Sequence, residues 1–168
     1  MRTRISIRHE DFSLDAEIEA LKGDNVGAMA SFVGLVRGED GLDSLTLEHY
    51  PAMTEREIAR CVAEAEKRWP LAAATVIHRV GRLAAGERIV LVAVAASHRR
   101  AAFEACEFLM DYLKTRAPFW KQEERAAGAV WVEAKPSDED AARRWDTATR
   151  SGNGQMVAAD TGRRTSSA

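Results

Sequence analysis

The sequence is poor in cysteine and has no long apolar run. Only two of its 168 residues are cysteine, and Cys61 and Cys106 stand far apart, with no second cysteine or histidine at metal-ligand spacing. This pattern excludes a disulfide scaffold and a zinc site, so we expect two small buried hydrophobic residues. The longest apolar stretch, Ile89 to Ala96, is far shorter than the roughly 20 residues that span a bilayer. Residues Met1 to Arg4 lead into no signal-type segment, so the expected location is cytoplasmic.

Neither sign of charge is in excess. The 24 Lys and Arg residues nearly balance the 26 Asp and Glu residues, which gives a formal net charge of -2. The chain therefore has no general attraction to nucleic acid or to an anionic membrane, and any anion site must be local. Its length and its 46% hydrophobic content suit one soluble domain. After Trp145 large apolar side chains almost disappear, which predicts a single domain over residues 1–145 and a disordered tail over 146–168.

Apolar patterns predict a fold in which strands and helices do not strictly alternate. Short β-branched or alternating runs predict strands at Arg4–Arg8, Gly27–Val36, Leu45–Tyr50, Ala74–Val80, Arg88–Ala96 and Val130–Glu133. Helical spacing predicts helices over Leu14–Gly23, Thr54–Trp69, Ser97–Ala117 and Ser137–Trp145. The strand Gly27–Val36 is expected to be buried. The Gly81–Gly86 turn is expected to join the strands Ala74–Val80 and Arg88–Ala96 into an antiparallel hairpin. The order predicts the α+β class, with a mainly antiparallel sheet packed against helices.

Polar residues mark the expected helix starts. Ser13 and Ser97 stand directly before helical patterns and are expected to cap them. Thr54 and Glu57 have the spacing of a capping box, in which the hydroxyl accepts the backbone N–H three residues on. A long helix is therefore expected to begin at Thr54.

Most catalytic motifs are excluded. The Gly81–Gly86 segment has the glycine spacing of a phosphate loop, but Glu87 and Arg88 stand where a lysine and a hydroxyl residue are required. No nucleophile elbow, metalloprotease motif or His/Cys cluster is present. Single histidines such as His78 are more often structural than catalytic.

Cations gather at the ends of the expected elements: Arg37, His98, Arg99, Lys114, Arg116 and Lys121. For Lys114 the residues alone favour a solvated cation that complements a helix C-terminus. His98 and Arg99 fit that interpretation less easily, because the first turn of a helix disfavours cations yet offers backbone N–H groups to an anion. A bound phosphate would explain both features, because it would pair with the cations and accept from the backbone N–H groups. The pair Phe119–Trp120 is typical of a core or an interface, although beside Lys121 it could also stack on a flat heterocycle.

Four stretches occur in an order that identifies a family. They are LTLEHYPAMT at Leu45–Thr54, VIHRVG at Val76–Gly81, SHR at Ser97–Arg99 and MDYLKTRAPFWK at Met110–Lys121. From about Gly27 to Trp145 the chain resembles the MoaE family, the large catalytic subunits of molybdopterin synthase. The resemblance implies an α/β hammerhead fold, which is compatible with the α+β class predicted above.

The resemblance also implies an activity and partners. In this family a small ubiquitin-like subunit of the MoaD type carries a thiocarboxylate on its C-terminal Gly-Gly. Its sulfur is transferred to cyclic pyranopterin monophosphate (precursor Z), which becomes the dithiolene molybdopterin of molybdenum cofactor biosynthesis. Two large subunits form a homodimer at the centre of a heterotetramer. The reaction needs no metal and no organic cofactor.

Site residues are carried over from the family by position. The catalytic residues are expected to be Lys114 and Lys121. Substrate-binding positions are expected at Leu35, Val36, Arg37, His98, Arg99, Lys114, Lys121, Gln122 and Glu123, and pocket-lining positions at Phe32, Met110 and Lys135. Leu35 departs from relatives that have lysine there, so Arg37 is the residue expected to supply a phosphate contact.

Two other classes of function stay open on the residues alone. One is a non-catalytic phosphate- or nucleotide-binding module, which the cations at His98 and Arg99 would suit. The other is an interaction subunit that anchors a partner through Phe119–Trp120. Sulfur incorporation into precursor Z distinguishes both from a synthase.

Overall fold

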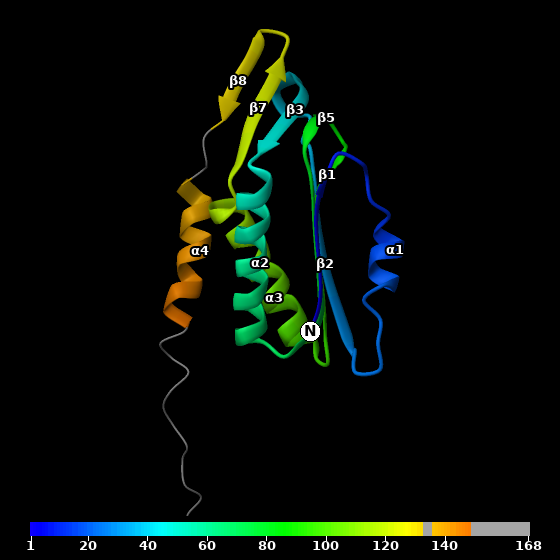
Figure 1. The fold of residues 1–168 in the computed structure, drawn as a ribbon. Coiled ribbons are helices and arrows are strands. Elements are labelled where there is room, and N and C mark those ends of the chain that lie inside the picture. The colour runs from blue at the N-terminus through cyan, green and yellow to red at the C-terminus, as the bar shows by residue number, and fades with distance from the viewer. Residues whose placement is uncertain (133–135, 149–168) are drawn as a thin grey trace, which may run out of the picture.

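The computed structural model describes residues 1–132 and 136–148, which form two four-stranded sheets and four α-helices (Figure 1). The strands are β1 (Arg2–Arg8), β2 (Ala28–Leu35), β3 (Leu42–His49), β4 (Leu71–Arg79), β5 (Gly81–Ala84), β6 (Arg88–Ala96), β7 (Phe119–Arg125) and β8 (Gly128–Val132). The helices are α1 (Leu14–Glu19), α2 (Pro51–Arg68), α3 (Arg99–Arg116) and α4 (Pro136–Ala148), and η1 (Glu39–Gly41) is a 3-10 turn. The α+β class is confirmed.

The larger sheet has the strand order β1-β4-β6-β2, and only β1 and β4 run parallel. Helices α2 and α3 cover one face and α1 covers the other, while α4 lies outside α3 (Figure 1). Val76 and Val92 pack toward α2 and α3, whereas Ile77 and Leu91 pack toward α1. The central strands β4 and β6 are thus buried on both faces, which explains their continuous apolar sequences.

The smaller sheet has the order β5-β3-β7-β8 and is antiparallel throughout. Its core contains Leu47 and Leu83 with Val36 from the end of β2. The chain crosses from one sheet to the other at Gly81, whose φ of 85° is accessible to glycine at little cost. The prediction of a simple turn over Gly81–Gly86 was therefore wrong for its first four residues, Gly81–Ala84, which form β5. Strands β4 and β6 are nevertheless antiparallel neighbours, as predicted.

Helix α2 begins earlier than predicted. Its N-cap is Tyr50 and its first residue is Pro51, a position where the fixed φ and the missing N–H of proline cost nothing. Thr54 is buried one turn further on, and its Oγ1 donates a hydrogen bond to the carbonyl of Pro118 at 3.2 Å. The predicted capping box was therefore wrong, since the hydroxyl ties α2 to the segment between α3 and β7.

The two predicted serine caps had different outcomes. The Ser13 cap is confirmed, because Ser13 Oγ accepts the N–H of Ala16 at 3.3 Å. The Ser97 cap was wrong. His98 is the N-cap of α3, and Ser97 Oγ instead donates to the carbonyl of Asn25 at 3.1 Å.

Strand β2 lies at the edge of its sheet, and within it only Ala30 is buried. The prediction of a buried strand was wrong because one neighbour is missing. Strand β7 was not predicted at all. In the described ranges no helix is long and apolar enough to cross a membrane. Residues 146–148, which the sequence assigned to a disordered tail, form the end of α4, and residues 149–168 of that predicted tail lie outside the described residues.

Candidate functional site

A cavity of about 430 Å³ lies between β2 and α3. Strand β2 contributes Phe32, and α3 contributes Phe103, Met110 and Lys114. These α3 residues recur at helical spacing, so they share the face that looks toward the sheet edge. The structure therefore brings Lys114 together with Phe32 and Met110, the two predicted pocket-lining residues that it describes. Lys135 lies outside the described residues.

The acidic side chains that line this cavity form ion pairs and hydrogen bonds with residues of α4. Glu107 and Asp111 line the cavity beside Lys114. Arg144 Nη2 lies 2.8 Å from Glu107 Oε1 and 2.6 Å from Asp111 Oδ2, and Trp145 Nε1 donates to the same Asp111 oxygen at 2.8 Å. Arg144 thus offsets part of the negative charge on this side of the cavity. Sequence reasoning missed it, because no local signal connects α4 with Lys114.

The cysteine of the cavity is not set up as a nucleophile. Cys106 is buried, and its Sγ lies 3.8 Å from the carbonyl oxygen of Val92. Burial raises the pKa of the Cys106 thiol to about 11, and burial likewise raises that of Cys61 to about 11. Both thiols therefore stay protonated near neutral pH, where only a thiolate attacks well. They are buried hydrophobic residues, as the sequence predicts, and a sulfur-transfer reaction here needs another sulfur donor.

Strand alternation divides the run that follows α3. Lys121 pairs with Leu47 and Glu123 with Leu45, whereas Gln122 pairs with Thr46. Because successive side chains of a strand point to opposite faces, Lys121 and Glu123 share the face of buried Leu47, and Gln122 lies on the other face. The three predicted positions therefore do not turn their side chains toward one site.

A buried histidine lies under the start of β7. The ring of His78 stacks on Phe119 with centroids 3.8 Å apart and planes 16° apart, and its Nδ1 lies 2.8 Å from the carbonyl oxygen of Arg79. Burial lowers the pKa of His78 to about 4, and the charge of nearby Lys121 acts in the same direction. His78 is therefore neutral near pH 7 and supports the strand that carries Lys121.

The predicted residues at the end of β2 and just after it, Leu35 to Arg37, also point to different sides. The side chain of Val36 is buried, and its N–H donates to the carbonyl of Glu87 at 2.9 Å. Leu35 is 53% exposed, and the exposed Arg37 lies with Nη1 3.5 Å from Glu39 Oε1. Leu35 and Arg37 can thus reach a ligand through their side chains, whereas Val36 anchors the segment in the core.

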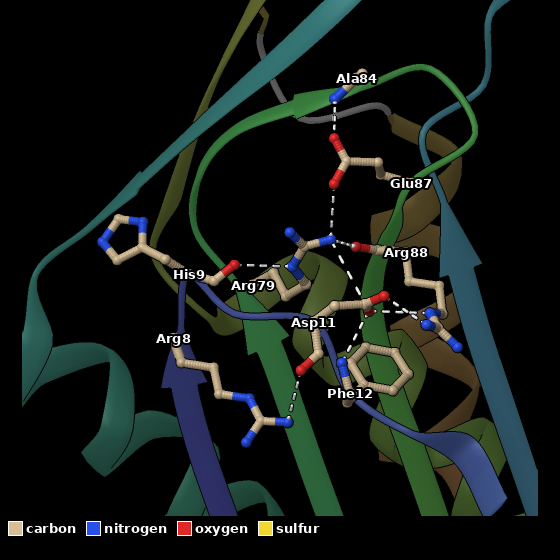
Figure 2. A network of polar contacts seen from close by, with 8 residues as sticks. All are labelled: Arg8, His9, Asp11, Phe12, Arg79, Ala84, Glu87 and Arg88. Atoms are coloured by element: carbon tan, nitrogen blue, oxygen red, sulfur yellow. Dashed lines mark hydrogen bonds and ion pairs between the residues drawn. The ribbon is translucent and has the colours of Figure 1, made fainter.

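A polar network holds this anchor in place (Figure 2). The buried Arg79 donates to the carbonyls of His9 and Arg88, both at 3.0 Å, and to Glu87 Oε1 at 3.2 Å. The other oxygen of Glu87 accepts the N–H of Ala84 at 2.6 Å, and Arg88 Nε donates to Asp11 Oδ1 at 2.9 Å. The carbonyl of Glu87 also accepts the N–H of Val36, the residue before Arg37. The network therefore fixes the position of the backbone from which the Arg37 side chain extends.

His98 and Arg99 lie away from this cavity. They are exposed at the start of α3, whereas Lys114 is in its last turn. At 1.5 Å per residue, Arg99 and Lys114 are about 22 Å apart along the helix. Arg37 is also remote from His98, because it follows the opposite end of β2. Within one chain, His98 and Arg99 are therefore separated from Lys114 and from Arg37.

The described residues include no cluster of three or more His, Cys, Asp or Glu side chains that could hold a metal ion. The charged side chains that line the cavity are Lys114, Glu107 and Asp111, and both carboxylates are paired with Arg144. A lysine can bind an anion, and lysine and carboxyl groups can move protons.

Comparison with known proteins gives these residues a family. A model described as MoaE protein matches residues 7–116. The chain belongs to the MoaE family. The matched range includes Lys114 and the whole described cavity, and it ends before Lys121.

Individual MoaE relatives cover most of the chain. A protein of Mesorhizobium japonicum called molybdopterin synthase catalytic subunit is 55% identical over 150 residues, which is 86% of this chain and 94% of the relative. The solved MoaE protein of Burkholderia ambifaria MC40-6 has a TM-score of 0.76 and 48% identity, and the match covers 86% of this chain and 98% of that one. A Helicobacter pylori 26695 structure, described as a complex of subunits 1 and 2 of molybdopterin-converting factor, has a TM-score of 0.67 and 24% identity over 79% and 91% of the two chains. At that identity the likeness concerns the fold.

Proposed function

We propose that this chain is the catalytic subunit of a molybdopterin synthase and that sulfur transfer takes place in the cavity beside Lys114. It transfers sulfur from the thiocarboxylated C-terminus of a small ubiquitin-like subunit to precursor Z, which yields the dithiolene of molybdopterin. The observation that carries the proposal is the meeting of Lys114, Phe32 and Met110 in one cavity of a MoaE-family chain. The cavity volume of about 430 Å³ lies in the range of small-ligand sites.

The chemistry matches the groups present. The thiocarboxylate sulfur forms a bond to an electrophilic carbon of the pterin side chain, and the cyclic phosphate opens. Water then cleaves the acyl C–S bond, which leaves sulfur on the pterin and a carboxylate on the small subunit. A second thiocarboxylated small subunit delivers the second sulfur of the dithiolene in the same way. Lys114 is suited to move protons in these steps and Lys121 to stabilise the developing negative charge. The protonated Cys61 and Cys106 take no part, which is consistent with an external sulfur donor.

Substrate contacts from both groups of cations require two copies of the chain. Arg99 and Lys114 are about 22 Å apart along α3, too far to touch one small pterin within a single copy. A two-fold dimer repeats each contact, so it offers two equivalent composite sites. We therefore include the homodimer in the proposal, with Lys114 of one copy facing His98 and Arg99 of the other. Phe103, which is 66% exposed at the rim of the cavity, supports coverage of this region by a second chain.

The small-subunit partner and the cellular location complete the proposal. The complex described for the Helicobacter pylori relative joins two subunits of a molybdopterin-converting factor, and the corresponding partner here is a MoaD-type protein with a C-terminal Gly-Gly thiocarboxylate. The expected assembly is a heterotetramer in the cytoplasm.

Reconstitution tests the proposed function. The purified chain is supplied with precursor Z and a thiocarboxylated small subunit, and molybdopterin is measured as its fluorescent oxidation product. The same small subunit with a plain carboxylate is the matched control and should give no product. Binding of precursor Z without any sulfur incorporation would favour the phosphate-binding module instead.

A further inference from the structure

An exposed aromatic hollow lies on the smaller sheet, outside the candidate active site. It is lined by Glu48, His49, Tyr50, Trp120 and Trp131. The three large rings, Tyr50, Trp120 and Trp131, are 57%, 42% and 53% exposed. Large rings gathered at the surface of a soluble protein mark a binding surface more often than isolated exposed residues do. Neither the sulfur-transfer chemistry nor the cavity beside Lys114 uses these side chains.

Strand register places a carboxylate among the rings. Glu48 of β3 pairs directly with Trp120 of β7, and Trp131 of β8 pairs with Gln122, two residues beyond Trp120. Residues two apart on a strand share a face, so Glu48, Trp120 and Trp131 project from the same side of the sheet. Tyr50 completes the hollow from the start of α2, with its ring 4.6 Å from that of Trp120 and at 80° to it. The aromatic hollow therefore has the negative Glu48 carboxylate beside its rings.

This composition selects a cation. Aromatic faces attract cations through their quadrupole, and Glu48 adds a full negative charge. Within residues 1–132 and 136–148 no lysine or arginine pairs with Glu48. In the same ranges, the guanidinium groups that lie over rings use other aromatic residues. An apolar side chain could also contact the rings, but it would leave the carboxylate without a role.

We propose that the aromatic hollow binds an arginine or lysine side chain of a protein partner. A single exposed cation–π contact is weak, so a free small cation would be held poorly, whereas a cationic side chain can serve as one anchor of a larger interface. The planar guanidinium of arginine suits the hollow best, because it stacks on one ring and presents N–H donors to a carboxylate. The proposal does not depend on the sulfur-transfer reaction.

Titration with matched peptides tests the proposal on the full-length chain. Because one exposed cation–π contact is weak, each probe is titrated into the millimolar range. The probes are acetyl-Gly-Arg-Gly-amide and the same peptide with citrulline, which keeps the shape of arginine but has no charge. Binding is followed through the indole N–H signals of Trp120 and Trp131 in a ¹⁵N-labelled sample. The arginine peptide should shift both signals and bind at least about fivefold more tightly than the citrulline peptide. A lysine peptide should bind more weakly than arginine but more tightly than citrulline.

Variants identify the groups responsible. Glu48→Gln should weaken the arginine peptide about fivefold and leave the citrulline peptide unchanged, whereas Glu55→Gln, an exposed position on α2, should change neither. Trp120→Phe should weaken the arginine peptide while the Trp131 signal still reports binding. Equal affinity for arginine and citrulline, tighter binding of a leucine peptide, an unchanged affinity in Glu48→Gln, or no shift of either indole would each overturn the proposal.

Discussion

Mixed dimers of two inactive variants test whether one active site draws residues from two copies of the chain. Lys114→Ala removes the lysine of the cavity, and Arg99→Ala removes a cation from the other end of α3. Because these positions are about 22 Å apart along the helix, one copy cannot supply both to a small substrate. Each variant alone should therefore be inactive as a homodimer, since every site in it lacks one of the two groups.

The expected activity of the mixed dimer follows from symmetry. One of its two sites combines both substitutions and the other contains neither, so purified mixed dimers should recover about half of the wild-type activity. Co-expression with two different affinity tags and sequential purification provides the mixed species, and molybdopterin formation is the assay. The matched control is Lys114→Ala with Lys121→Ala. We assign both lysines to the same copy's site, so that pair should recover nothing. No recovery with Arg99→Ala in verified mixed dimers would refute the composite site.

Three further predictions concern single residues. Lys114→Ala should abolish molybdopterin formation with an unchanged circular dichroism spectrum, and Lys114→Arg should rescue little because a guanidinium does not give up its proton; near wild-type activity of the arginine variant would leave only an electrostatic role. Cys106→Ser should keep most activity, because burial raises the thiol pKa to about 11 and the thiol stays protonated; complete loss in a folded protein would contradict an external sulfur donor. Burial lowers the pKa of His78 from 6.5 to about 4, so the unfolded chain takes up a proton first as pH falls. The free energy of unfolding should therefore decrease as the pH falls from 7 to 4.5, by about 2 kcal/mol relative to His78→Phe. Urea unfolding of both proteins at these two pH values measures the difference.

The interior of the larger sheet could be predicted from the sequence. Strands β4 and β6 are continuous apolar runs, and the apolar residues of α3 recur at helical spacing. The apolar pattern is therefore enough to identify these three elements. The same information places Cys61 and Cys106 inside the protein. Lys114 was found through a family motif, and not through helix physics, which favoured a solvated cation at that position.

Strand β7 shows where local patterns fail. Its sequence, FWKQEER, has no alternation of apolar and polar residues, so nothing local indicates a strand. Its backbone pairs with β3 on one side and β8 on the other. The strand is held by backbone hydrogen bonds to β3, which is distant in sequence, and to β8, which follows it directly. The side-chain pattern of β7 indicates neither pairing. A similar reason explains α2, where Thr54 binds the carbonyl of Pro118 instead of capping its own helix.

The sequence by itself determined that β4, β6 and the apolar faces of α2 and α3 are buried, that the fold is of the α+β class, and to which family the chain belongs. Those properties depend on residue type and on short spacings, which the chain retains in any conformation. Only the tertiary structure decided that Lys114 of α3 meets Phe32 of the edge strand β2, that Arg144 pairs with Glu107 and Asp111 beside that lysine, and that Arg99 lies at the far end of the helix. Each of these facts is a distance between residues remote in sequence, or along a whole helix, and such distances are set by packing rather than by composition.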